Sequence, residues 1–136
     1  MKREKIILSI DPGREKCGVA ILSSHKGVIC HKVIMTDNFL DELNHIISPY
    51  NLYCIVLGDR TACSEIRKKL SSVKSEKGIV SVDEHMTTEL ARKRYFIENP
   101  PEGFKKFIPR GLMVPPEPYD DYAAIILGER FFKNEQ

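Results

Sequence analysis

The chain has 136 residues, of which 42% are hydrophobic and 29% are charged, a composition typical of globular proteins. Its formal net charge is only +2, which permits nucleic acid as a partner but does not require it. No apolar run reaches the roughly 18 residues that span a bilayer, and the N-terminus lacks the pattern of a signal peptide. We therefore expect one domain, residues 1–136, in the cytoplasm and with no membrane partner.

Three strands are predicted at the start of the chain. Residues 5–10, 18–22 and 28–34 are rich in β-branched and other apolar residues, and a D-P-G turn and a short polar loop separate them. Connections this short join antiparallel neighbours. We therefore expect the chain to open with three antiparallel strands.

Helices and strands alternate after this meander. Helical spacing or capping residues predict helices at 38–47, 64–70, 87–98 and 120–132, and apolar runs predict strands at 52–57 and 78–82. This order is typical of an α/β fold in which helices cover a mixed sheet. The prediction is a five-stranded mixed sheet, three antiparallel strands followed by parallel ones, flanked by helices.

Residues 100–119 contain six of the eight prolines and no periodic pattern. Proline disfavours regular structure, and unstructured segments of this length are usually functional or disordered. We expect a flexible loop whose two ends lie near the acidic residues described below, and which closes over nucleic acid. Its aromatic residues Phe104 and Phe107 are expected to anchor it to the core, and the alternative is that they stack on bases.

Cys17, Cys30, Cys54 and Cys63 are widely spaced, so we expect reduced and mostly buried thiols rather than a disulfide or zinc framework. The four histidines show no spacing typical of metal ligands either. Zinc is therefore not expected.

Acidic residues stand at the ends of two predicted strands. Asp11 follows the first strand and precedes Pro-Gly, and the pair Asp83-Glu84 follows the fifth strand. Ligands gather at the carboxyl ends of strands in α/β sheets. Each acid also has an ordinary alternative role. Asp11 would cap the turn that follows the strand, and Glu84 would interact favourably with the dipole of the next helix.

A third acidic pair, Asp120-Asp121, opens the last predicted helix. Asp120 begins a stripe at helical spacing that continues through Ala123, Ala124, Leu127 and Phe131. Converging carboxylates repel one another unless hard cations such as Mg²⁺ or Mn²⁺ neutralise them. The acids therefore predict a metal site at which two ions about 4 Å apart activate water for phosphodiester cleavage. Asp120 is the expected third ligand, Asp121 is a further or substitute ligand, and Asp83 is another acid expected to support or replace a ligand.

Four segments in order carry a resemblance to a known family: DPGREKCGVAI, VLGDRT, VDEHMTTELA and DDYAAIIL. Together they resemble the RuvX/YqgF branch of the RuvC-like resolvases, within the ribonuclease H-like superfamily, over most of the chain. The resemblance implies a ribonuclease H-like fold and a two-metal nuclease using Mg²⁺ or Mn²⁺, with catalytic residues Asp11, Glu84 and Asp120. It also implies a structured nucleic-acid substrate, either pre-16S rRNA in ribosome biogenesis or a Holliday junction. His85 stands where the family usually has arginine, so the choice between RNA and branched DNA stays open.

Several basic residues are expected to meet phosphates near these motifs: Lys16, Arg92, Lys93, Lys105, Lys106 and Arg110. The alternative is that these basic residues belong to an ordinary solvated surface and do not contact phosphates. The oligomeric state, monomer or dimer, is left open.

Two other functions are compatible with the sequence. Asp11 to Gly18 also fits the D-x-G-x-x-x-x-G phosphate loop of sugar-kinase or actin-type ATPases, which need two lobes where this chain supplies one. The chain is also compatible with a ribosome-assembly module that binds nucleic acid without cutting it.

Overall fold

Five strands form one mixed sheet in the order β3-β2-β1-β4-β5 in the computed structural model, which describes residues 3–59, 63–103, 107–109 and 112–135. The strands are β1 (Ile6–Asp11), β2 (Lys16–Ser23), β3 (Gly27–Met35), β4 (Cys54–Gly58) and β5 (Ile79–Val82). The pairs β1–β2 and β2–β3 are antiparallel, and β1–β4 and β4–β5 are parallel. The predicted sheet, three antiparallel strands followed by parallel ones, is confirmed.

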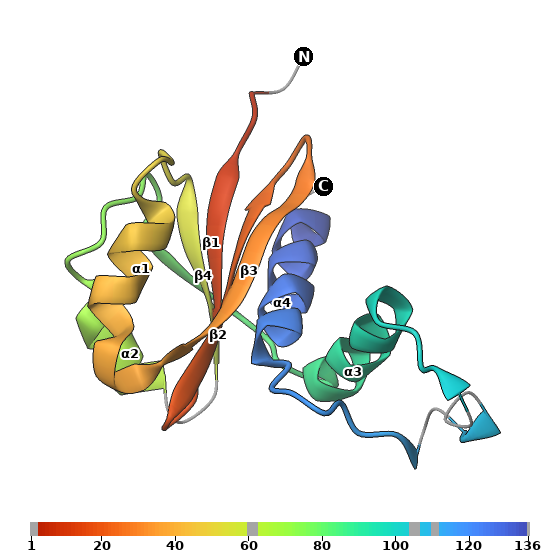
Figure 1. Cartoon of the computed structure of the whole chain (residues 1–136). Helices are drawn as coiled ribbons and strands as arrows, with labels where there is room; N and C mark the ends of the chain where they lie inside the picture. The colour runs from red at the N-terminus through yellow and green to blue at the C-terminus, as the bar shows by residue number, and fades with distance from the viewer. Residues whose placement is uncertain (1–2, 60–62, 104–106, 110–111, 136) are drawn as a thin grey trace.

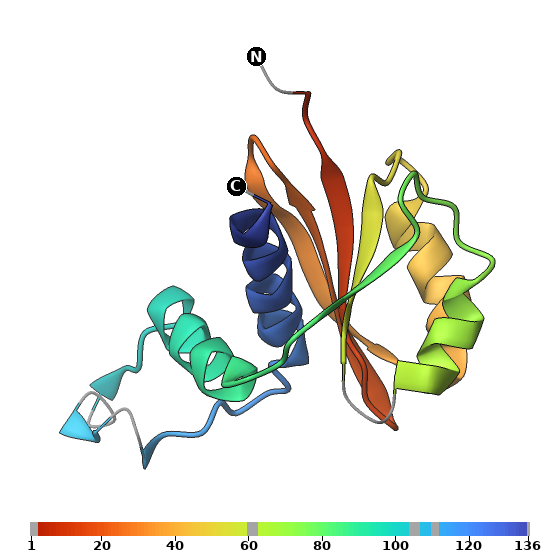
Figure 2. The same cartoon turned by 180° about the vertical axis from the view of Figure 1, so that it is seen from behind.

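Helices cover both faces of this sheet (Figures 1 and 2). On one face lie α1 (Phe39–Ile47), which follows the 3-10 turn η1 (Thr36–Asn38), and α2 (Cys63–Leu70). On the other face lies α4 (Asp120–Asn134), with α3 (Thr87–Glu98) packed against its outer side. None of the helices in the described ranges is long and apolar enough to cross a membrane.

Alternation along the strands divides the apolar residues between two cores. On β1, Ile7 faces the α4 side, whereas Leu8 and Ile10 face the side of α1 and α2. All three are fully buried, and burial of each such side chain contributes about 1.5–3 kcal/mol. The central strand therefore has helices packed on both of its faces.

Small residues allow α4 to lie close to the sheet. The predicted stripe is buried from Ala123 onward, with Ala124 and Leu127 fully inaccessible, whereas Asp120 at its start is half-buried. The Ser9 hydroxyl donates a hydrogen bond to the Ala124 carbonyl at 2.6 Å, directly linking β1 to the helix. This contact helps to fix where α4 begins, and therefore where Asp120 lies.

The cysteines behave as predicted wherever they are described. Cys17, Cys30 and Cys54 are free thiols, two of them buried and Cys30 half-buried, and the side chain of Cys63 lies outside the described residues. Burial raises the pKa of Cys54 to about 12, so this thiol stays protonated at neutral pH.

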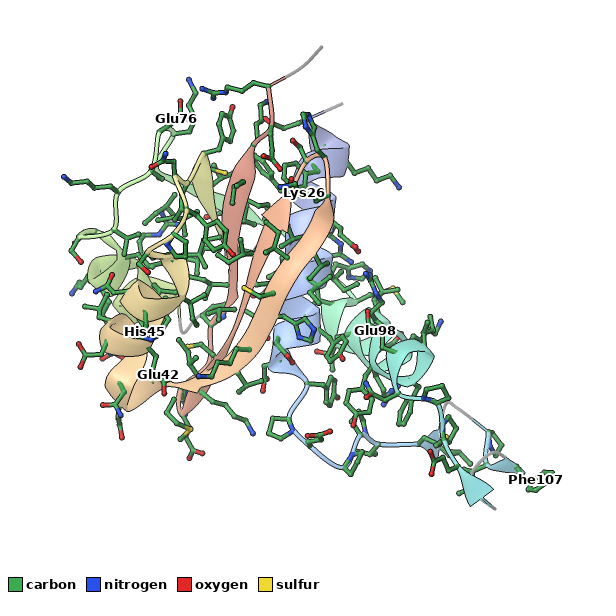
Figure 3. All side chains as sticks on the ribbon, turned by 45° about the horizontal axis from the view of Figure 1, so that its top comes forward. Lys26, Glu42, His45, Glu76, Glu98 and Phe107 are labelled. Atoms are coloured by element: carbon green, nitrogen blue, oxygen red, sulfur yellow. The ribbon has the colours of Figure 1, made fainter. Side chains whose placement is uncertain are left out.

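The segment between α3 and α4 does not use the anchor expected from the sequence. The Phe107 side chain is 84% exposed and lies far from the sheet (Figure 3), so its expected role as an anchor is wrong; Phe104 lies outside the described residues. Met113 is buried instead, and the Tyr95 hydroxyl donates to the Glu117 carboxylate at 3.0 Å. Among the residues of this segment that the structure describes, Met113 and Pro115 are the buried ones.

Candidate active site

Asp11 is the last residue of β1 and lies on the side of the sheet that faces α4. Ile7 and Ser9 contact that side, and side chains two residues apart share a face. The Asp11 side chain is only 9% exposed. Its partner in the antiparallel ladder is Gly18 of β2.

The start of α4 rests on that glycine. A β-carbon added at Gly18 would lie 1.9 Å from the Asp120 carbonyl oxygen and 2.6 Å from the Asp121 nitrogen. Only glycine leaves room for the helix backbone there. Asp120 is thereby brought beside Asp11, and both residues line one cavity of about 400 Å³.

Glu84 reaches the same corner from the other side of Asp11. A β-carbon added at Gly58 would lie 2.4 Å from the Glu84 Cδ, so the carboxyl group rests on the last residue of β4. Leu57 pairs with Ile10, which makes Gly58 the neighbour of Asp11 across the parallel ladder, about 5 Å away. Glu84 is 5% exposed. The carboxyl ends of β1 and β4 therefore bring Asp11 and Glu84 together.

The three carboxylates share a corner without forming a complete ligand sphere. Glu84 is not among the residues that line the cavity of Asp11 and Asp120. Within the described ranges, no group of three His, Cys, Asp or Glu side chains has the geometry of a metal site. The donors nevertheless fit Mg²⁺ or Mn²⁺, because all three are carboxylates and hard oxygen ligands suit these ions.

Asp121 points to a different neighbour. Its Oδ2 lies 2.7 Å from the Nδ1 of His31 on β3, and its Oδ1 accepts a hydrogen bond from the Tyr122 amide at 3.1 Å. The His31 ring also packs on Tyr122, with ring centroids 5.0 Å apart. Asp121 thus ties α4 to β3, and we leave it out of the ligand set proposed below.

Asp83 is exposed, and its carboxylate accepts a hydrogen bond from the His85 amide at 3.0 Å. It stabilises the turn after β5. Of the acidic pair at this strand end, only Glu84 is buried against the sheet.

Of the predicted phosphate-binding residues that the structure describes, one lies at the acidic corner and two lie on α3. Lys16, at the start of β2, lines the cavity of Asp11 and Asp120. On α3, Arg92 is half-buried and Lys93 is exposed. Lys105, Lys106 and Arg110 lie outside the described residues.

Thr88 lines the cavity beside Asp120 and was missed by sequence reasoning, although it lies in the segment VDEHMTTELA. The segment 115–119 lines the same cavity, as predicted for this end of the loop. The expectation that both ends of the 100–119 loop lie near the acids is half right. Pro100 and Pro101 line another cavity at the far end of α3, and that helix of 12 residues is about 18 Å long.

A larger cavity, about 580 Å³, lies away from these acids. Its lining includes Arg3, Lys5, Leu22, Phe132 and Glu135, at the end of the sheet where β1 begins. Lys5 forms an ion pair with Glu135 there at 3.1 Å. Its acidic residues Glu129 and Glu135 are both paired with basic side chains, Arg94 and Lys5, so we place the candidate active site at Asp11 despite the smaller volume.

Comparison with known proteins supports the fold. No protein-family model matches the sequence, and no curated protein sequence matches it. The structure is similar to that of RuvC from Thermus thermophilus, with a TM-score of 0.56 and 10% sequence identity, covering 96% of this chain and 95% of that one. The fold is therefore the ribonuclease H-like α/β fold. At this identity the similarity concerns the fold alone.

Gly58→Ala is expected to displace Glu84 with only a moderate loss of stability. The three atoms nearest to the added methyl group all belong to the Glu84 side chain, which can rotate away. We expect the rate of metal-dependent cleavage to fall at least about tenfold, because loss of a residue that supports a metal ligand costs about 10–100-fold. We expect the free energy of unfolding to fall by about 1–2 kcal/mol.

Gly128→Ala is the matched control, because its methyl group would press on the Leu22 side chain at 2.7 Å in the core. Cleavage rates and urea denaturation of both variants test the prediction. Equal cleavage by Gly58→Ala and wild type would show that Glu84 does not act from this position.

Proposed function

We propose that this chain is a metal-dependent endonuclease of the RuvX/YqgF type that cuts structured nucleic acid, with Asp11, Glu84 and Asp120 as its catalytic residues. The observation that supports this most is the placement of three acidic residues from separate elements around one corner of the sheet, with Glu84 over Gly58, Asp120 over Gly18 and Asp11 between these two glycines. The fold shared with RuvC supports the same class of activity.

In this proposal Asp11, Glu84 and Asp120 hold Mg²⁺ or Mn²⁺. The ions would activate water and stabilise the leaving oxygen of a phosphodiester. Asp11 is central, because Gly58 under Glu84 and Gly18 under Asp120 are its neighbours on either side. Lys16 stands in the same cavity and would attract a phosphate of the substrate.

The ATPase alternative loses its main support. A glycine at the last position of the D-x-G-x-x-x-x-G pattern is needed where the backbone of another segment comes so close that a β-carbon would not fit. Gly18 supplies that room to the start of α4, since an added β-carbon would collide with Asp120. The pattern is therefore explained by helix packing within this chain.

The substrate class that we propose is structured RNA of the kind found at the ends of pre-16S rRNA, and branched DNA is the alternative. The test incubates the purified chain with an end-labelled structured RNA and with a four-way DNA junction. Each substrate is tested with Mn²⁺, with Mg²⁺ and with a chelator. Metal-dependent cuts in the RNA alone support rRNA processing, and cuts in the junction alone support a resolvase.

Binding of either substrate without any cleavage would contradict the nuclease proposal and favour a ribosome-assembly module. Cleavage that persists with the chelator would point to a contaminating nuclease and not to this site.

A further inference from the structure

The turn that carries Glu84 has an unusual backbone. Met86 has a φ of 61°, the left-handed conformation that residues other than glycine rarely adopt. The Glu84 carbonyl accepts hydrogen bonds from the Thr87 amide at 3.0 Å and from the Thr87 hydroxyl at 2.9 Å. A turn of this kind persists only when its surroundings hold it in place.

Arg130 of α4 fixes this turn through two hydrogen bonds to its backbone. Its two terminal nitrogens donate hydrogen bonds to the carbonyl oxygens of Asp83, at 2.7 Å, and His85, at 2.5 Å. These carbonyls belong to the residues on either side of Glu84. A guanidinium presents two parallel donors in a rigid plane, so it can fix both carbonyls together, which an ammonium group does less well.

We propose that Arg130 is a positioning residue that holds the Glu84 carboxylate over Gly58 beside Asp11. This inference rests on the proposed function and assigns a role to a residue far from the acids in sequence. Asp120 and Arg130 belong to the same helix, ten residues or about 15 Å apart along its axis. The helix α4 thus contributes the Asp120 carboxylate and, through Arg130, orients the turn that carries the Glu84 carboxylate.

The positioning of the turn can be tested without metal or substrate. In Arg130→Met, the aliphatic stem stays and both donors are lost. We expect the Thr87 amide, which bonds to the Glu84 carbonyl, to exchange its hydrogen at least about tenfold faster than in wild type. Arg94→Met is the control, because Arg94 joins α3 to α4 through Glu129 at 2.9 Å without touching the turn. Unchanged exchange at Thr87 in Arg130→Met would overturn the inference.

A second readout separates positioning from general stability. Mn²⁺ binding and cleavage are titrated in both proteins. We expect the Mn²⁺ concentration at half-maximal effect to be about tenfold higher in Arg130→Met than in wild type, because loss of residues that orient metal ligands weakens metal affinity on this scale. Arg130→Lys, which keeps the charge, should recover part of this loss, and RNA binding in chelator should not change. Arg94→Met should titrate like wild type.

The two proposals fail differently. If the wild type binds no Mn²⁺, the proposed function fails, and the role of Arg130 in positioning a metal ligand fails with it. If the wild type binds Mn²⁺ and cleaves, and Arg130→Met has the same Mn²⁺ requirement, only the inference about Arg130 is overturned.

Discussion

Replacement of Asp11 by Asn is expected to abolish metal-dependent cleavage while the chain remains folded. The substitution keeps the size of the side chain and removes its charge at the centre of the three acids. Loss of a residue that merely orients a metal ligand costs about 10–100-fold, so loss of a ligand itself should lower the rate by more than about a hundredfold. The melting temperature should stay the same or rise, because repulsion between neighbouring carboxylates is relieved.

Asp41→Asn is a suitable control for this experiment. Asp41 is exposed on α1, on the opposite face of the sheet, and its replacement removes the same charge. Cleavage rates under matched Mn²⁺ and melting curves of both variants decide the outcome. If Asp11→Asn cuts as fast as wild type, Asp11 is a residue of the turn and the proposed site is wrong.

The largest expected effect on stability belongs to Gly18→Ala. The added methyl group would lie 1.9 Å from the Asp120 carbonyl oxygen and 2.1 Å from its carbon, and both are backbone atoms that cannot rotate away. The start of α4 must then move off β2. We expect a loss of about 3 kcal/mol or more in the free energy of unfolding, at or above the usual range for overpacking.

Urea denaturation measures this loss, and Gly128→Ala again serves as the comparison. At that position the neighbour is the flexible Leu22 side chain, so the loss should be clearly smaller. A change below about 1 kcal/mol in Gly18→Ala would contradict the close contact between β2 and the first turn of α4.

The fold could be predicted from the sequence because its elements are marked by strong local patterns. The run around Ile7 to Ile10 and the stripe from Ala123 to Phe131 are buried as expected. The sheet order follows from short connections at the start and crossover connections later. The positions of Asp11 and Glu84 at strand ends follow from the same patterns.

The assembly of the site depends on contacts between distant residues that no local pattern shows. The stripe in the sequence favours Asp120 over Asp121, but it does not show that Asp121 pairs with His31, 90 positions away. The hold of Arg130 on the Glu84 turn is likewise a contact across 45 or more positions. The sequence shows glycine at 18 and 58, but not which backbone or side chain fills the space that each leaves.

The Pro-rich segment shows why the prediction of an anchor was wrong. Apolar residues without a helical or strand period carry no information about which side faces the core. Phe107 is exposed, whereas Met113 and Pro115 are buried. The expected closure of this segment over nucleic acid remains a prediction.

The most direct test of the proposed site is anomalous diffraction from crystals of the wild-type chain soaked in Mn²⁺. We expect manganese peaks between the carboxylates of Asp11, Glu84 and Asp120, and we expect these peaks to be lost in Asp11→Asn crystals soaked in the same way. No manganese at this corner of the sheet, or manganese bound only by other residues in both crystals, would contradict the proposed site.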